Sequence, residues 1–249
     1  MFSADPYPPL NVLKPIADDV WIVDGPVVRM RYLLGSTLPF STRMTVVRLS
    51  GGRLWIHSPT ALTEPLAAAV ADLGEVAFLV APNRIHWVSL GAWQAAFPAV
   101  RTFAAPGVED KAEEGGFRVN ATLDGAAPSE WADEIDQVSV SGRFMTEIEF
   151  FHRASRTLIL TDLIENFEAG HVHGPFVETV MGLSGVLDPN GSTPRDLRLT
   201  FHKDAARVAV ETIIGWAPER VVLAHGRCYL DNATGELKRA LAWTGATAR

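Results

Sequence analysis

Short apolar or alternating runs recur along the chain and predict strands bounded by turn-forming residues. The glycine pair at 51–52 is typical of a hairpin turn between two of these strands. The stretch 29–44 fits either a pair of strands or an extended loop. The predicted strands cover residues 20–25, 45–50, 53–57, 76–82, 100–106, 135–142, 146–153, 157–162 and 219–223.

Helix-forming segments alternate with some of these strands. Thr63 is suited to cap a helix that ends at Gly74, and Pro98 ends an amphipathic segment. The predicted helices cover residues 63–74, 87–98, 108–114, 203–215 and 233–243. A β-rich part followed by a strand–helix part occurs twice, which indicates an α/β layer architecture. The less regular stretch 163–194 predicts loops around a short helix near 176–181, as in an active-site lid.

Composition narrows the class of protein. The chain has 249 residues, of which 47% are hydrophobic and 20% charged, and we expect a single domain over 1–249. The net charge of −7 argues against nucleic acid as a partner, because a phosphate backbone requires a Lys/Arg stripe that the sequence lacks. A small molecule is the expected partner.

Localisation follows from cysteine usage and from the N-terminal segment. The single cysteine, Cys228, cannot form an internal disulfide. The segment 1–15 has acidic and proline residues where a secretory signal requires a basic start and an apolar stretch. A membrane span requires about 18 apolar residues in a row, and none is expected. We therefore expect a cytoplasmic protein that does not enter a membrane.

Three of the apolar runs are followed by a residue of metal-ligand type. These residues are His86, Asp162 and His225. In open α/β sheets the ligand-binding crevice lies outside the ends of the strands. Two imidazoles and a carboxylate brought together there could hold one divalent metal and leave a position open for water.

The order of these residues resembles that in the metallo-β-lactamase-like superfamily. In that superfamily one strand ends in a Thr-His-x-His-x-Asp-His run, a later strand ends in a bridging aspartate and a last strand ends in a histidine. The segments APNRIH, EFFHRASRTLILTDLIENF and RVVLAHG look like an uncharacterised domain family within it. The resemblance implies a four-layer αββα sandwich, with His86, Asp162 and His225 as metal ligands.

The same resemblance implies a reduced set of metal ligands. Ala81, Asn83 and Ile85 stand where the superfamily has two histidines and an aspartate. A further histidine would fall in 138–147, which contains none. The motif is therefore interpreted as degenerate, with room for one metal, zinc ahead of iron or manganese, or for none. In a site without metal, Asp162 would hydrogen-bond the two imidazoles.

Other polar residues are candidates for substrate contact or proton transfer. His171 and His173 would point the same way on an extended backbone, so they are candidates for a lid that completes the site, although solvated loop histidines are the simpler interpretation. His173 is the predicted proton donor to a leaving group. His57 and Asn83 are predicted to contact substrate, with a structural histidine and a turn residue as the alternatives.

The function expected from these residues is metal-assisted hydrolysis of a small ester, thioester or lactone, in which Asp162 is a ligand and also orients the nucleophile. The acyl substrate is implied by the superfamily alone. The alternative is a member without catalytic activity that keeps the fold as a small-molecule binding or interaction scaffold. A di-iron redox centre would need more carboxylate and histidine ligands than the matched positions supply.

Overall fold

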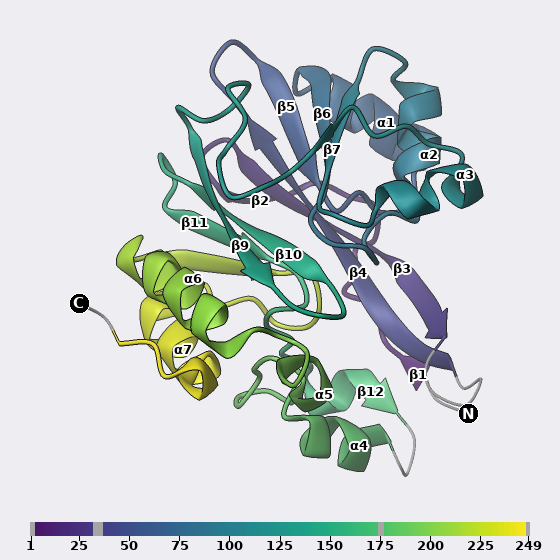
Figure 1. Ribbon diagram of the computed structural model, residues 1–249. Coiled ribbons are helices and arrows are strands. Elements are labelled where there is room, and N and C mark those ends of the chain that lie inside the picture. The colour runs from purple at the N-terminus through teal and green to yellow at the C-terminus, as the bar shows by residue number, and fades with distance from the viewer. Residues whose placement is uncertain (1–2, 32–36, 174–176, 248–249) are drawn as a thin grey trace.

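Two β-sheets face each other at the centre of the molecule, and helices cover the outer face of each (Figure 1). The structure is a computed structural model that describes residues 3–31, 37–173 and 177–247. A short two-stranded sheet lies beside them and joins β1 (Ser3–Ala4) to β12 (Val172–His173) in antiparallel register.

The first sheet has seven strands in chain order. They are β2 (Lys14–Ala17), β3 (Val20–Arg31), β4 (Thr37–Arg48), β5 (Arg53–His57), β6 (Glu75–Ala81), β7 (Arg101–Ala104) and β8 (Ala121–Thr122). Neighbours are antiparallel from β2 to β5 and parallel from β5 to β8. Most of the stretch 29–44 therefore forms the arms of the long β3–β4 hairpin, whereas residues 32–36 lie outside the described ranges.

The second sheet has four strands. In spatial order they are β13 (Arg220–Leu223), β11 (Thr157–Leu160), β10 (Thr146–His152) and β9 (Ile135–Ser141). The strands β9, β10 and β11 are antiparallel, as the close spacing of their sequence runs predicts. The last strand, β13, pairs with β11 in parallel, so the C-terminal ends of both strands lie at the same edge of the sheet.

Most helices agree with the predicted segments but are shorter in several places, and the single-turn helix α5 was not predicted. Their bounds are α1 (Glu64–Ala71), α2 (Leu90–Ala96), α3 (Ala112–Gly115), α4 (Val177–Ser184), α5 (Arg195–Arg198), α6 (Lys203–Gly215) and α7 (Ala233–Ala240), with 3₁₀ turns η2 (Glu109–Lys111), η3 (Ala169–His171) and η4 (Ala242–Thr244). The Thr63 side chain caps α1 by accepting from the Leu66 amide at 3.3 Å. The predicted helix 108–114 is a 3₁₀ turn followed by a single helical turn.

Three apolar clusters fill the spaces between the layers. One lies between α1, α2 and the first sheet and includes Leu66 and Trp93. Another lies between the two sheets and includes Trp55 and Phe150, and the third packs α6 and α7 on the second sheet. The layers are thus helix, sheet, sheet and helix, which confirms the predicted αββα sandwich.

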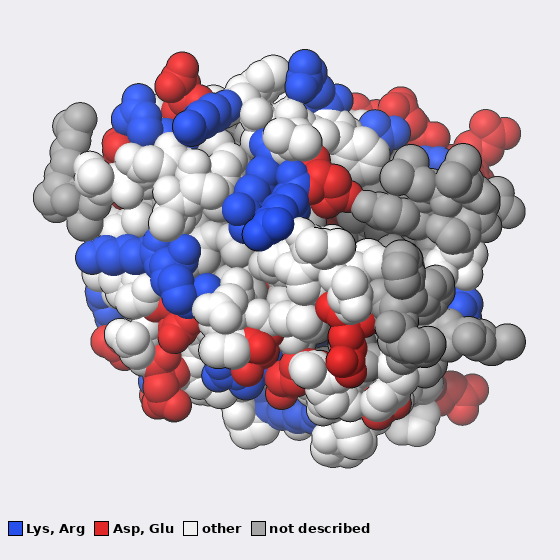
Figure 2. All heavy atoms as spheres, turned by 90° about the horizontal axis from the view of Figure 1, so that it is seen from below, with Lys and Arg blue, Asp and Glu red and all other residues white. Residues whose placement is uncertain are grey.

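The surface carries both signs of charge. Figure 2 shows basic and acidic side chains interspersed over the face that is seen from below. Within the described ranges, every helix is too short or too polar to cross a lipid bilayer.

Candidate functional site

His86, Asp162 and His225 meet at one edge of the two sheets, as their positions after strands predict. His86 lies in the turn after β6, and the other two lie two residues beyond β11 and β13. His86 Nε2 is 3.1 Å from Asp162 Oδ2, and His225 Nε2 is 3.3 Å from Asp162 Oδ1. One ligand atom from each residue lies within 4.8 Å of the others. Below, these three residues are called the triad.

The local chain after β6 brings His86 to this edge. The Asn83 side-chain oxygen accepts from the Ile85 amide at 3.0 Å, which forms a turn closed by the asparagine side chain. The His86 amide then donates to the Asn83 carbonyl at 3.3 Å. This turn places the His86 imidazole against Asp162.

The ring of His225 has a fixed tautomer when it is neutral. Its Nδ1 lies 2.7 Å from the Ser41 backbone carbonyl, which can only accept a hydrogen bond. Nδ1 therefore carries a proton, and the lone pair of neutral Nε2 faces the Asp162 carboxylate. Two acceptors that face each other at 3.3 Å require a proton or a metal ion between them.

Ser58 holds the ring of His86. Its hydroxyl lies 2.6 Å from His86 Nδ1 and can either donate or accept there. Ser58 has a φ of 51°, in the left-handed region that few residues other than glycine adopt. Ser58 directly follows β5, and in this backbone conformation its hydroxyl points toward His86 of the triad.

The backbone around Asp162 is fixed by hydrogen bonds to the Glu147 carboxylate on β10. Glu147 Oε1 accepts from the backbone amides of Thr161 and Leu163, both at 3.0 Å. Its Oε2 accepts from the Asp162 amide at 3.1 Å and from Asn83 Nδ2 at 3.0 Å. Asn83 Nδ2 also lies 2.6 Å from Asp162 Oδ2. The backbone and the carboxylate of Asp162 are therefore both fixed by buried groups.

Burial and charge act in opposite directions on the pKa values of the triad. Burial by itself would raise the pKa of Asp162, but the charge of His86 and hydrogen bonds with both imidazoles lower it below its usual range. Burial by itself would lower the pKa of His225, but Asp162 raises it above its ordinary value. Burial raises the pKa of the neighbouring Glu165 to about 8. The site thus favours an ionised Asp162 beside a cationic partner.

The triad opens into a small pocket of about 160 Å³. Polar lining comes from the triad itself and from hydroxyl groups. Apolar lining comes from β3, β4, the segment after β5 and the turn before α2. The pocket is lined by Pro26, Val28, Phe40, Thr42, Ser58, Pro59, Thr60, Ala61, Ile85, His86, Val88, Ser89, Asp162 and His225.

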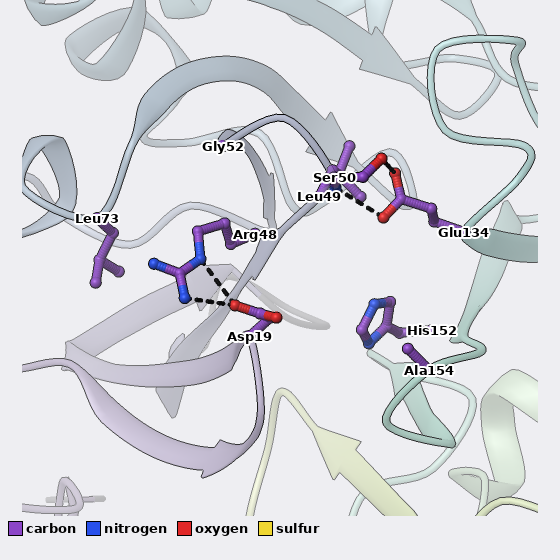
Figure 3. A pocket seen from close by; sticks show the side chains of 9 residues that line it. All are labelled: Asp19, Arg48, Leu49, Ser50, Gly52, Leu73, Glu134, His152 and Ala154. Atoms are coloured by element: carbon purple, nitrogen blue, oxygen red, sulfur yellow. Dashed lines mark hydrogen bonds and ion pairs between the residues drawn. The ribbon is translucent and has the colours of Figure 1, made fainter.

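A second, more open pocket of about 480 Å³ is lined by Asp19, Arg48, Leu49, Ser50, Gly52, Leu73, Glu134, His152 and Ala154. Figure 3 shows that its charged groups are already paired, Arg48 with Asp19 and Glu134 with Ser50. Within the described part of the chain, the triad is the group whose side chains could hold a metal. We therefore place the candidate site at the triad.

The other predicted site residues lie elsewhere. His57 is 2% exposed and stacks on Trp55 at 5.6 Å, and burial lowers its pKa well below the ordinary value. His171 stacks on the Tyr7 ring at 4.6 Å, and His173 Nε2 lies 2.8 Å from Asp5 Oδ2. Of the described residues, none of these three histidines lines the pocket or belongs to the triad.

The substrate-contact and proton-transfer roles expected of these residues therefore stay predictions, and the structure shows the contacts that each residue makes. The two loop histidines are engaged by the N-terminal segment rather than by the triad. The side-chain NH₂ of Asn83 donates to Glu147 and Asp162, and its oxygen accepts from the Ile85 amide. These contacts within the protein favour the turn interpretation over substrate contact. The helix predicted near 176–181 is α4, but residues 174–176 lie outside the described ranges, and a lid role for this region stays a prediction.

Three supporting residues were not found from the sequence. Glu147 and Glu149 are acidic residues that alternate with Ile148 and Phe150 on one strand, a signal of buried function that could have been used. Ser58 follows His57 at a strand end and had no separate signal. Arg43 is 5% exposed, and its Nη1 donates to the carbonyls of Leu223 and Gly226, so it holds the loop that carries His225.

The donor set fits one zinc-type ion. Zinc bonds to nitrogen and carboxylate oxygen are about 2.0–2.1 Å long, so the ligand atoms of a tetrahedral ion lie about 3.3–3.4 Å apart. Each imidazole lies at about that spacing from a different oxygen of Asp162, His86 Nε2 at 3.1 Å from Oδ2 and His225 Nε2 at 3.3 Å from Oδ1, and one ligand atom from each residue lies within 4.8 Å of the others. The fixed tautomer of His225 provides the lone pair that a metal needs.

Comparison with known proteins gives a family and a fold. The family described as "Domain of unknown function (DUF4336)" matches residues 33–173. No curated protein matches the chain. Similar solved structures include the DIM-1 metallo-β-lactamase, with a TM-score of 0.60 and 14% identity over 97% of this chain and 99% of that chain.

Two further structures extend this likeness. A metallo-β-lactamase from Hirschia baltica has a TM-score of 0.60 and 14% identity over 94% of this chain and 97% of that chain. The metal-soaked Flv1 flavodiiron core from Synechocystis sp. PCC6803 has a TM-score of 0.62 and 11% identity over 97% of this chain and 61% of that chain. At these identities the likeness shows the metallo-β-lactamase fold alone.

Proposed function

We propose that this chain, which belongs to the DUF4336 family of domains of unknown function, is a hydrolase that uses one divalent metal at the triad. The proposed substrates are small esters, thioesters or lactones. The observation that carries the proposal is the arrangement of His86, Asp162 and His225 side by side in the lining of a small pocket. Three protein ligands leave the fourth position of a tetrahedral metal open.

In this proposal His86 Nε2, Asp162 and His225 Nε2 hold the metal. A divalent ion bound there would supply Lewis acidity, lowering the pKa of a water molecule toward neutrality and polarising a carbonyl. The residues around it fix the ligands: Ser41 sets the tautomer of His225, and Ser58 orients His86. Such partners commonly change metal affinity by about 10–100-fold.

Hydrolysis then requires a positioned water molecule and a place for its proton. Asp162 would orient the water through its carboxylate. The water oxygen adds to the acyl carbon and the water gives up a proton. The bond between that carbon and the ester oxygen or thioester sulfur then breaks, and the leaving alcohol or thiol takes up the proton. We do not assign the protonation of the leaving group to His173, because its imidazole is paired with Asp5.

The scaffold without catalysis is the second candidate function. Both imidazoles lie within ion-pair distance of Asp162, so a protonated triad would be complete without a metal. In that case the pocket would bind a small molecule and leave it unchanged.

Metal content separates these two functions. Protein purified without added metal is measured by elemental analysis beside a His86→Ala/His225→Ala double variant. The proposal expects about one zinc, iron or manganese ion per chain in the wild type and a loss of at least tenfold in the variant. Equal and negligible metal in both proteins would leave the scaffold function.

Activity is the second test. Hydrolysis of a neutral ester such as 4-nitrophenyl acetate is followed before and after treatment with a chelator, and again after zinc is restored. Chelation and Asp162→Asn are each expected to lower kcat/KM by about 100-fold or more, the loss expected for a first ligand. Turnover that ignores both changes would locate the chemistry away from the triad.

A further inference from the structure

The imidazole of His152 lines the second, more open pocket from the end of β10 (Figure 3). His152 is 3% exposed, so almost all of its surface is enclosed by the protein. Its Nδ1 lies 2.8 Å from the Ser155 hydroxyl. Its Nε2 has no hydrogen-bond or ion-pair partner among the residues that the structure describes. A partner for Nε2 must therefore come from the pocket, which has a volume of about 480 Å³.

A chain of hydroxyl groups fixes the tautomer of this imidazole when it is neutral. Thr157 Oγ1 donates to the Ser155 carbonyl at 3.4 Å, so it accepts the proton of Ser155 Oγ at 2.8 Å. Ser155 Oγ has no second proton and therefore accepts from His152 Nδ1. The lone pair of neutral Nε2 then faces the pocket. Burial lowers the pKa of His152 and outweighs the charges of Glu134 and Asp19, which raise it.

Two carboxylates line the same pocket, and a cation is paired with one of them. Asp19 Oδ1 lies 2.8 Å from Arg48 Nε and 2.6 Å from Arg48 Nη2, whereas Asp19 Oδ2 has no partner in the described part of the chain. Glu134 accepts from the Ser50 amide and from the Ser50 hydroxyl, both at 2.8 Å and both neutral donors. Of the described lysine and arginine residues, none lies within ion-pair distance of Glu134. The pocket therefore has one carboxylate more than it has guanidinium groups.

A primary ammonium group matches this set of acceptors. It brings a positive charge and N–H donors, and the pocket offers the Nε2 lone pair and two carboxylates to accept them. An anion would instead compete with Asp19 for Arg48, whose Nε and Nη2 are already engaged. Apolar lining for a hydrocarbon stem comes from Leu49, Leu73 and Ala154. The volume is ample for a short stem, because about 150 Å³ accommodates benzene.

We propose that the second pocket binds the primary ammonium group of a small alkylamine, which donates to His152 Nε2 and to the carboxylates of Asp19 and Glu134. Gly52 of this pocket precedes β5, whereas Ser58 of the triad pocket follows it, so the two pockets lie at opposite edges of the sheets. The inference therefore does not depend on the proposed hydrolase function.

The test compares three compounds that share a butyl stem, each added to the full chain at constant ionic strength. n-Butylammonium has both a charge and N–H donors, 1-butanol lacks the charge, and butyltrimethylammonium lacks the N–H donors. Long-range ¹H–¹⁵N NMR of the imidazoles follows the Nε2 signal of His152, which is assigned by its absence from His152→Asn. We expect n-butylammonium to shift this signal in a saturable titration and to bind about threefold or more tighter than either other compound.

Matched substitutions test the acceptors one at a time, with binding followed by saturation-transfer NMR. His152→Asn keeps a donor near the position of Nδ1 but removes Nε2, whereas His152→Gln keeps an acceptor near Nε2. The first is expected to weaken n-butylammonium binding about threefold or more, and the second to retain it within about twofold. Glu134→Gln is also expected to weaken it about threefold or more, whereas Glu211→Gln removes the same charge from α6 and leaves it unchanged.

Three results would overturn this inference: no binding of n-butylammonium, equal binding of butyltrimethylammonium, or equal losses in Glu134→Gln and Glu211→Gln. The His86→Ala/His225→Ala variant shows where the amine binds. It is expected to keep the affinity for n-butylammonium, and a loss there would assign the binding to the triad and reject the second pocket. Amine binding without ester hydrolysis would reject the proposed hydrolase function alone.

Discussion

Glu147 shows how much of the site depends on single buried groups. Each of its carboxylate oxygens accepts from two N–H donors, three from the backbone of 161–163 and one from Asn83. Burial and the charge of Asp162 raise the pKa of Glu147, while these donors favour its ionised form. An amide at this position would direct its own N–H groups at two of the donors.

Glu147→Gln is therefore expected to destabilise the fold by about 1–3 kcal/mol, the cost of leaving buried donors unpaired. Urea unfolding followed by circular dichroism measures this loss. Glu211→Gln is the matched control, because Glu211 lies on α6 and makes an i,i+4 pair with Arg207 at 3.1 Å. Its expected effect is below about 0.5 kcal/mol. Equal losses in the two variants would contradict the role given to Glu147.

Glu149 is the second residue whose surroundings lead to a test. It points to the same side of β10 as Glu147, and its two carboxyl oxygens are buried without a hydrogen-bond partner among the described residues. Burial and the charge of Glu147 raise the pKa of Glu149 well above its usual value. The folded chain therefore keeps a proton on this group at pH values where the unfolded chain has released it.

The consequence is a loss of stability as pH rises above the pKa of the unfolded chain, about 4.3. Glu149→Gln removes this dependence, since glutamine resembles the protonated acid and does not titrate. The variant is expected to match the wild type near pH 4 and to exceed its stability at pH 7 by up to about 1.4 kcal/mol for each pH unit above that pKa. Urea unfolding across this range checks it, and a difference that is independent of pH would contradict it.

At the scale of elements, β4 joins the N-terminal half of the chain to the loop after β13. Ser41 accepts from His225, and the buried Arg43 guanidinium pairs with Asp24 and donates to two carbonyls of that loop at 2.6 and 2.8 Å. The position of one triad imidazole is therefore set by a strand from the other sheet.

Arg43→Met is expected to cost about 1–3 kcal/mol, because it leaves two buried carbonyls without a donor and Asp24 with Lys14 as its remaining ion-pair partner. Thermal or urea unfolding gives this value, and metal titration of the folded fraction is expected to show affinity lowered by about 10–100-fold. Arg48→Met is the control on the same strand: Arg48 pairs with Asp19 at the surface, where its side chain is 41% exposed. That pair is expected to contribute below about 1 kcal/mol, and a larger loss there than at Arg43 would reject the argument.

At the scale of the whole molecule, the triad takes residues from both sheets. His86 follows a strand of the first sheet, whereas Asp162 and His225 follow strands of the second. A metal held by all three would bind the folded chain and not the unfolded one, and so would stabilise the entire sandwich.

Zinc at about 100 times its dissociation constant is expected to add about 2.7 kcal/mol, which raises the melting temperature of a chain of this size by roughly 5–10 °C. Differential scanning calorimetry with zinc and with calcium measures this shift. Calcium prefers a set of six or more oxygen ligands, so it is expected to have little effect. The same rise in the His86→Ala/His225→Ala variant would show that zinc stabilises the chain elsewhere.

The sequence determined the parts of the structure that depend on neighbouring residues. Alternating or continuous apolar runs predicted β9, β10 and β11, and Thr63 marked the start of α1 through a bond to an amide three residues away. It also located the three polar residues at strand ends, because chain order and strand pattern can be read along the chain.

The tertiary structure decided how these parts meet. Arg43 Nη1 contacts a carbonyl 180 residues away, and Glu147 reaches the amide of Asp162 across a pair of strands. The pairing of His173 with Asp5 joins positions 168 residues apart and links this histidine to the N-terminal segment. Local pattern fixes which face of an element is buried, but the partner of a buried polar group depends on long-range packing, which single-residue preferences do not encode.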